Sequence, residues 1–420
     1  MNEKVNIMDD LITMGQQAQQ AAQQLSQLST SQKNHILKLV AQSLRKHTDE
    51  IVEKNNQDLG NADGLASSFV DRLTLDDERI EQIAVGVEQV VALQDPIGDI
   101  DKGWKTEDDL YITKQRVPLG VIGMIYEARP NVTVDAFALT FKTGNAVILR
   151  GGKEALLTNI QLVEAIKEVL RDNDIDENAV QILHDTSHKT ANEMMSLTGY
   201  IDVLIPRGSA RLIKTVVENA KVPVIETGAG NCHIYVDEFA QAQMAADIIV
   251  NAKTQRPSVC NAAEKIVIHS SVAEQFLPII AAALKPYNVE LRGDERARAI
   301  LPDINVATEE DWGTEYTDYI MAVKVVDSLD EAIEHINKYN TKHSESIITD
   351  NYANSEKFLQ RIDAACVYVN ASTRFTDGFK FGFGAEIGIS TQKLHARGPM
   401  GLNELTSTKY LIRGNGQIRE

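Results

Sequence analysis

The chain has 420 residues, of which 43% are hydrophobic and 24% charged, and its formal net charge is -18 at pH 7. A chain of this length holds two or three domains, and its composition excludes the disordered and membrane-spanning classes. The negative charge repels phosphate backbones and no basic run is interleaved with aromatic residues, so nucleic acid is not expected as a partner.

The N-terminal region is predicted to be helical and to carry no targeting segment. Residues 1–10 place no basic flank before an apolar block, and no later segment reaches the roughly 18 uninterrupted apolar residues of a membrane span. Residues 11–58 favour helix, with Ser29 and Gln32 in a capping-box pattern ahead of apolar residues at helical spacing. The Gln/Ala stretch over 16–24 is typical of a solvated helix face.

An extended arm and a series of buried strands are predicted next. Alternating residues from Leu110 to Arg116 form the arm, and Pro118 then leads into the apolar run 121–125. Short apolar runs then alternate with helical patterns, which predicts parallel sheets covered on both faces. The first series has strands at 146–149, 180–183, 203–205 and 222–225, with helices near 154–171, 188–198 and 208–220. The second has strands at 234–236, 266–268, 323–326, 347–348 and 367–369, with helices near 240–253, 272–285 and 328–339. We therefore expect two α/β domains.

Cys260 is the candidate nucleophile. The chain has only three cysteines, an odd and sparse set that suits a reducing compartment, so we expect a cytoplasmic protein. Pro257 interrupts a helix and leaves Cys260 in a polar loop, where exposed N–H groups or Arg256 would lower the pKa of its thiol. Cys232 and Cys366 each open an apolar strand run and fit buried, inert thiols better.

Two strand ends carry residues suited to ligand binding. Glu226 ends a strand and precedes glycines that would let a ligand or another backbone approach closely, although a solvated turn fits the segment too. Gly208 and Ser209 lie between a strand and a helix, where free N–H groups suit a phosphate or where a plain helix cap forms. The G-x-G-x-x-G fingerprint is absent, which argues against an ordinary Rossmann enzyme.

No metal site is expected. His335 and His343 are separated by 343 − 335 = 8 residues across a helix end and its loop, which is a poor spacing for chelation.

Together these segments resemble the aldehyde dehydrogenase superfamily, and within it the family of glutamyl phosphate reductases, over nearly the whole chain. In that superfamily a strand-end glutamate precedes the catalytic cysteine by a characteristic interval, which 260 − 226 = 34 reproduces. The narrower resemblance rests on the strings at 126–131, 255–261, 370–378 and 394–401. It implies an aldehyde dehydrogenase-like α/β fold with two parallel-sheet domains plus a small oligomerisation arm. The implied ranges are 1–104 and 118–228 for the NADP-binding domain, 229–400 for the catalytic domain, and 105–117 and 401–420 for oligomerisation elements.

The resemblance also implies a cofactor and the residues that hold it. Arg150 matches a superfamily lysine, and Lys153 falls where NAD-preferring members carry a ribose-binding glutamate. A cation there favours a 2′-phosphate, so NADPH is implied. Glu315 matches the glutamate that holds the nicotinamide ribose in relatives, and Gly208 with Ser209 would complete the cofactor site.

The implied reaction is reduction of glutamyl 5-phosphate to glutamate 5-semialdehyde in proline biosynthesis, through a thioester on Cys260. Water attack would waste the thioester, so Glu226 would position groups or move protons. Hydrolytic relatives carry an oxyanion-binding asparagine where this chain has Arg129, so either Arg129 serves the substrate or a small shift lets Asn131 act beside the Cys260 N–H.

A negatively charged protein needs local cations to bind an anionic substrate. Arg129, Arg374 and Arg397 are the candidates, because guanidinium forks match both phosphate and carboxylate; each could instead pair with a structural Asp or Glu.

Two other functions stay open. One is an oxidising, hydrolytic aldehyde dehydrogenase, disfavoured by Lys153 and the missing asparagine; the other is a catalytically silent interaction protein on the same fold. A homo-oligomer is expected from the arm and the last strand near 406–413, and contact with glutamate 5-kinase, which makes the substrate, is left open.

Overall fold

The computed structural model describes residues 7–61, 64, 67–127 and 129–419. Residues 1–6, which entered the prediction of no targeting segment, and Ala128 of one family string lie outside the described residues. The chain forms two compact units. Unit 1 comprises Met1–Glu226, Phe383–Gly388 and Met400–Glu420, and unit 2 comprises Thr227–Gly382 and Ile389–Pro399.

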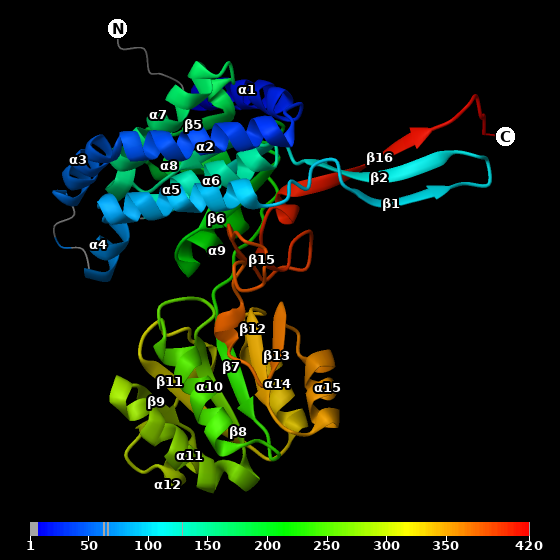
Figure 1. Cartoon of the computed structure of the whole chain (residues 1–420). Helices are drawn as coiled ribbons and strands as arrows, with labels where there is room; N and C mark the ends of the chain where they lie inside the picture. Colours follow the sequence, from blue (N-terminus) through cyan, green and yellow to red (C-terminus); the bar gives the residue numbers. More distant parts are fainter. Residues whose placement is uncertain (1–6, 62–63, 65–66, 128, 420) are drawn as a thin grey trace. The chain divides into compact units, whose positions relative to one another are not determined.

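Unit 1 contains a four-stranded parallel sheet in the order β5-β4-β3-β6. Helix α1 packs against three of these strands, α6 and α7 also pack on the sheet, and α2 and α5 form a further layer over them (Figure 1). Its helices are α1 (Ile7–Leu25), α2 (Thr30–Lys46), α3 (Thr48–Leu59), α4 (Ser67–Leu73), α5 (Asp77–Ala92), α6 (Asn131–Lys142), α7 (Leu156–Asp172), α8 (His188–Met195) and α9 (Ala210–Asn219). Its sheet strands are β3 (Val121–Tyr126), β4 (Ala146–Arg150), β5 (Val180–Ile182) and β6 (Val203–Arg207).

The predicted long helix over 11–58 is three helices. The capping box is confirmed at the start of α2, because the Gln32 N–H donates to Ser29 Oγ and the Ser29 N–H donates to Gln32 Oε1. The Gln/Ala stretch in α1 is only partly a solvated face: Ala18 and Ala21 are buried, and the side chain of Gln24 bonds the backbone of a loop of the same unit.

The predicted arm belongs to a three-stranded antiparallel sheet in the order β1-β2-β16. Its strands are β1 (Ile100–Lys105), β2 (Tyr111–Pro118) and β16 (Thr406–Arg413), and the sheet extends away from the helices of unit 1 (Figure 1). Large side chains remain exposed on it: Ile100, Tyr111, Tyr410 and Ile412.

Unit 2 is built on a seven-stranded parallel sheet in the order β10-β9-β11-β8-β7-β12-β13. Its strands are β7 (Cys232–Val236), β8 (Ala263–His269), β9 (Glu290–Gly293), β10 (Asn305–Val306), β11 (Ile320–Val326), β12 (Ser344–Ile348) and β13 (Cys366–Val369). Its helices are α10 (Ala242–Thr254), α11 (Ser270–Leu284), α12 (Glu295–Ile300), α13 (Glu309–Gly313), α14 (Leu329–Tyr339) and α15 (Tyr352–Arg361). Two apolar cores, one with α10, α11 and α12 and one with α14 and α15, bury the sheet. The short strands β14 (Gly388–Ser390) and β15 (Gly398–Met400) lie where the chain passes between the units.

The predicted fold class is therefore confirmed, with one strand corrected. The segment 222–225 forms only an isolated bridge between Val224 and Leu204, because Pro223 has no N–H to donate to a ladder. Among the described residues, every helix is too short or too polar to cross a bilayer.

Candidate functional site

Cys260 lies in unit 2 in the loop that joins α10 to β8. The polar segment after β13 holds this loop from the side: Thr373 Oγ1 donates to the carbonyl of Asn261 at 2.7 Å, and Asn261 Nδ2 donates to the carbonyl of Thr376 at 2.8 Å. Cys260 is half-buried, whereas Cys232 and Cys366 are buried. Desolvation raises the pKa of both buried thiols, that of Cys232 to well above its usual value.

A glycine packs tightly against the Cys260 peptide. A Cβ added to Gly230 would lie 1.4 Å from the Cys260 carbonyl oxygen, so only glycine fits there. The Gly230 N–H donates to Glu315 Oε1 at 2.7 Å. Desolvation raises the pKa of Glu315, and the hydrogen bond from Gly230 opposes that rise. Cys232 Sγ donates to the same Cys260 carbonyl at 3.3 Å, so this peptide is fixed from two sides.

Arg374 supplies a positive charge to the Cys260 loop. Its Nε donates to Gln255 Oε1 at 3.0 Å. Desolvation lowers the pKa of Arg374, and the charge of Cys260 opposes that fall, so guanidinium and sulfur lie within electrostatic range. Unit 2 thus brings together Cys260, Arg374 and Glu315 from three separate segments.

Arg397 is engaged elsewhere in unit 2. It is exposed, and its Nη2 donates to Asp363 Oδ1 at 2.7 Å. Asp363 also pairs with Lys342 at 3.0 Å and Lys393 at 3.1 Å. Although desolvation opposes them, these three cations hold the pKa of Asp363 well below its usual range. Arg397 therefore belongs to a cation cluster around one carboxylate in this structure.

The two cations predicted to meet a 2′-phosphate lie at the end of β4 in unit 1. Arg150 is the last residue of β4, and its Nη2 donates to the carbonyl of Thr186. Its buried Nε has no hydrogen-bond partner within the described ranges. Lys153 follows in the turn before α7 and is exposed. A guanidinium with a spare donor and an exposed ammonium fit a dianionic group.

The Gly208–Ser209 turn holds an anion, but the anion is a side chain of the protein. Ser209 caps α9, and its N–H and Oγ donate to the Glu127 carboxylate at 2.7 and 2.8 Å. A Cβ on Gly208 would lie 2.7 Å from Glu127 Oε2. The turn therefore has the donors that an anion needs at a helix N-terminus.

The remaining predicted residues of unit 1 are Arg129, Asn131 and Glu226. Asn131 is the first residue of α6, and its Nδ2 donates to Asp135 Oδ2 at 2.9 Å. Desolvation raises the pKa of Asp135 to about 6, although that hydrogen bond opposes the rise. The Arg129 N–H donates to the Glu127 carbonyl at 2.7 Å. Glu226 is half-buried at the last position of unit 1 before Thr227 opens unit 2.

Some residues that shape these sites were not singled out from the sequence. Glu127 lies in the string 126–131 without an assigned role, and a carboxylate beside a strand end was the available signal. The prediction that the glycines after Glu226 admit another backbone is confirmed at Gly230, but its partner Cys260 was not predicted. Glu264 and Lys265 follow the Cys260 loop, and two adjacent charges opening an apolar strand were the available signal there.

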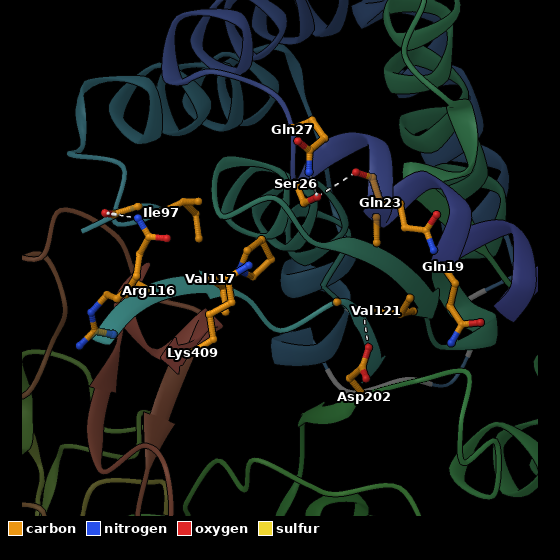
Figure 2. A pocket seen from close by; sticks show the side chains of 15 residues that line it. Gln19, Gln23, Ser26, Gln27, Ile97, Arg116, Val117, Val121, Asp202 and Lys409 are labelled. Carbon is orange, nitrogen blue, oxygen red and sulfur yellow. Dashed lines mark hydrogen bonds between the residues drawn. The ribbon is translucent and has the colours of Figure 1, made fainter. Parts of the chain in front are cut away.

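A cavity of about 580 Å³ in unit 1 is lined by none of the predicted catalytic, cofactor-binding or substrate-binding residues. Figure 2 shows it between the end of α1 and β2, where the Val121 N–H donates to Asp202 at 2.8 Å. Over the part of the chain that the structure describes, no group of His, Cys, Asp and Glu side chains could hold a metal ion.

Comparison with known proteins gives matches over nearly the whole chain. Residues 8–310 and 299–411 match the aldehyde dehydrogenase family. The gamma-glutamyl phosphate reductase of Ligilactobacillus salivarius is 64% identical over 412 residues, which cover 98% of this chain and 99% of that protein. The crystal structure of gamma-glutamyl phosphate reductase from Thermotoga maritima superimposes with a TM-score of 0.97 at 50% identity, covering 98% and 100% of the two chains. An acetylating aldehyde dehydrogenase from Geobacillus thermoglucosidasius shares the fold, with a TM-score of 0.69 at 15% identity over 99% and 98% of the chains.

Proposed function

Because the chain belongs to the aldehyde dehydrogenase family and to its gamma-glutamyl phosphate reductase branch, we propose that it reduces L-glutamyl 5-phosphate to L-glutamate 5-semialdehyde with NADPH, through a thioester on Cys260. It is an oxidoreductase with a small-molecule substrate, and its family implies a nicotinamide cofactor. NADPH, the thioester and the roles of individual residues are the parts that we propose.

The observation that carries the proposal is the environment of Cys260. It is half-buried on a loop, its peptide is fixed by Gly230, and a guanidinium lies within electrostatic range of its sulfur. A nearby positive charge stabilises a thiolate, which is the nucleophilic form. The other two cysteines differ in burial: both are buried, and desolvation disfavours their thiolates although guanidinium charges reach them as well.

The chemistry follows from a thiolate beside cations. The Cys260 sulfur attacks the acyl carbon, the bond from carbon to the phosphate oxygen breaks, and phosphate leaves with the bonding pair. The Cys260 N–H, with either Asn131 or Arg129, would stabilise the developing oxyanion. A bound NADPH would supply the hydride that takes the acyl carbon to the aldehyde level. Cleavage of the carbon–sulfur bond then releases the semialdehyde and returns the thiolate.

The cofactor roles that the family implies fall on five residues. Arg150 and Lys153 would meet the 2′-phosphate, the Gly208–Ser209 turn the pyrophosphate, and Glu315 the nicotinamide ribose. The spare Nε of Arg150 and the anion already bound by the turn support these roles within unit 1.

The arginines and Glu226 complete the proposed site. Arg129, Arg374 and Arg397 would bind the phosphate and carboxylate of the substrate; for Arg397 this requires release from Asp363. Glu226 would position groups or move protons rather than activate water, because hydrolysis would destroy the thioester.

The test is a multiple-turnover reaction in the oxidative direction with the semialdehyde, NADP⁺ and phosphate, because phosphate must release the acyl group from Cys260 before the next turnover. We expect reduction of NADP⁺ that depends on phosphate, is abolished in Cys260→Ala and persists in the matched control Cys366→Ala. Turnover in Cys260→Ala would refute the thioester, and turnover without phosphate would favour the oxidising, hydrolytic function instead.

We also propose that the β1-β2-β16 sheet joins copies of the chain into a homo-oligomer. Its exposed Ile100, Tyr410 and Ile412, each 59% accessible, support an apolar contact surface. A cytoplasmic location and contact with the kinase that supplies glutamyl phosphate stay predictions.

A further inference from the structure

Two adjacent buried charges follow the Cys260 loop. In the parallel pairing of β7 with β8, Cys232 lies opposite Ala263 and His233 lies opposite Lys265. Glu264 is therefore an extra residue in the ladder, a β-bulge. Side chains of a regular strand alternate between faces, and a bulge breaks that alternation, so Glu264 and Lys265 can serve the same neighbour.

That neighbour is the turn 314–317 that carries Glu315. Lys265 Nζ donates to the Thr314 carbonyl at 2.6 Å and lies 4.4 Å from the centre of the Tyr316 ring. The Thr317 N–H donates to Glu264 Oε1 at 3.2 Å. The turn is thus held at both ends by the two residues of the bulge.

The turn 314–317 also holds the Cys260 peptide in place. Glu315, between the two anchored ends, accepts the N–H of Gly230, and the space beside Gly230 is filled by the carbonyl of Cys260. An unbroken series of contacts therefore runs from the Lys265 ammonium through Glu315 and Gly230 to the nucleophile's backbone. All of these residues lie in unit 2.

Stability alone is a poor reason for this arrangement. Lys265 is 1% exposed, and the cost of removing an ammonium from water offsets much of what its contacts contribute to stability. Desolvation lowers the pKa of Lys265 to about 7, which reflects that burial. What an apolar residue cannot supply is the hydrogen bond to Thr314.

We propose that Lys265 is a positioning residue for Cys260, acting through the turn 314–317, Glu315 and Gly230 to fix the peptide of the nucleophile. The proposal rests on the proposed function, in which Cys260 carries the acyl group.

The experiment compares Lys265→Met, which keeps the length of the side chain but loses the donor, with Lys265→Arg, which keeps a cationic donor. Lys324→Met is the matched control, because Lys324 lies on the adjacent strand β11 and pairs with Asp294 at 3.4 Å, whereas Lys265 bonds the turn 314–317. Three quantities are measured: kcat with both KM values, the rate at which iodoacetamide alkylates Cys260 without substrate or cofactor, and the thermal midpoint.

In Lys265→Met we expect kcat to fall roughly 10- to 100-fold, as for a nucleophile displaced by a fraction of an ångström, with KM values within about 2-fold. The rate at which iodoacetamide alkylates Cys260 changes together with kcat, and Lys265→Arg restores kcat and the alkylation rate. Native kcat and alkylation in a folded Lys265→Met protein would overturn the proposal, as would a loss confined to the thermal midpoint.

Gly230→Ala tests the next link without removing a buried charge. Its Cβ must displace the Cys260 carbonyl, so kcat and the alkylation rate should change as in Lys265→Met, and native values would contradict the proposed series of contacts. Failure of the proposed function has a different signature, because Cys260→Ala would then retain turnover whatever Lys265 does.

Discussion

Removing Lys253 should leave the Glu264 carboxylate without its ion-pair partner in the core of unit 2. Lys253 Nζ on α10 lies 2.9 Å from Glu264 Oε2 on β8, and both side chains are fully buried. Desolvation raises the pKa of Glu264 to about 7, opposed by the ammonium of Lys253. In Lys253→Met the ammonium no longer opposes the rise of the Glu264 pKa. Among the described residues, the Thr317 N–H then donates the remaining hydrogen bond to Glu264. We therefore expect the folded variant to keep Glu264 protonated to a pH well above 7.

The size of the effect follows from the proton. At pH 7 the native Glu264 is already close to half protonated, so the variant differs from the native protein in protonation mainly above that pH. At pH 8.5 the native carboxylate is charged whereas the variant must bind a proton, which costs about 1.36 × (8.5 − 7), or about 2 kcal/mol. This is part of the roughly 3–5 kcal/mol lost when one partner of a buried pair is removed. Because the variant binds a proton above pH 7 that the native protein does not, the stability penalty of Lys253→Met shrinks by about 2 kcal/mol as the pH falls from 8.5 to 5.5 and Glu264 becomes protonated in both proteins.

Urea unfolding followed by tryptophan fluorescence measures this penalty. The chain has two tryptophans, and a Trp104→Phe background leaves Trp312, which is buried in unit 2, as the reporter. The double variant Lys253→Met/Glu264→Gln is the control, because without the carboxyl group its penalty should not change between pH 8.5 and 5.5. A penalty for Lys253→Met below about 1 kcal/mol at pH 8.5, or one that does not shrink between pH 8.5 and 5.5, would refute the reasoning.

Two further predictions concern the cofactor and acid stability. Lys153→Glu should raise the KM for NADPH roughly 10-fold or more and lower that for NADH, because a carboxylate repels the 2′-phosphate and accepts a ribose hydroxyl; unchanged preference in steady-state kinetics would remove Lys153 from the site. Desolvation lowers the pKa of the buried His343 to about 4, so the unfolded chain binds a proton that the folded chain does not between about pH 6.5 and 4. The free energy of unfolding should fall by up to about 3 kcal/mol as the pH falls through that window. The thermal midpoint of His343→Gln should lose part of this pH dependence, whereas that of the exposed control His35→Gln should keep it.

The sequence predicted the parallel strands because they are buried on both faces. Runs such as β3 and β4 are continuous apolar segments, and burial of that kind leaves a clear signal. The helix α15 gave little signal, because only Ser355 and Phe358 of its ten residues are buried. The segment 222–225 looked like a strand by its apolar residues, and the single proline that prevents a ladder was outweighed by them.

For the candidate site, the sequence indicated residue types but not long-range contacts. Pro257 and the polar loop were enough to single out Cys260. The contact of Gly230 with Cys260 and the bond from Glu315 to Gly230 join residues 30 and 85 positions apart, and no local pattern encodes such pairs. The bulge at Glu264 is likewise invisible in one strand, because it is defined only by the pairing with β7.

The Gly208–Ser209 turn illustrates how far a local motif can identify a ligand. Free N–H groups at a helix start predict an anion, and the structure has one there, since the Glu127 carboxylate accepts both Ser209 donors. A carboxylate and a phosphate satisfy the same donors, so the motif alone cannot distinguish them. Those two donors cannot serve both anions fully at once, and a phosphate bound at this turn therefore competes directly with Glu127. The affinity of the turn for a phosphate depends on the difference between the interaction free energies of the turn with phosphate and with the Glu127 carboxylate. The surrounding fold sets that difference, and the local motif does not.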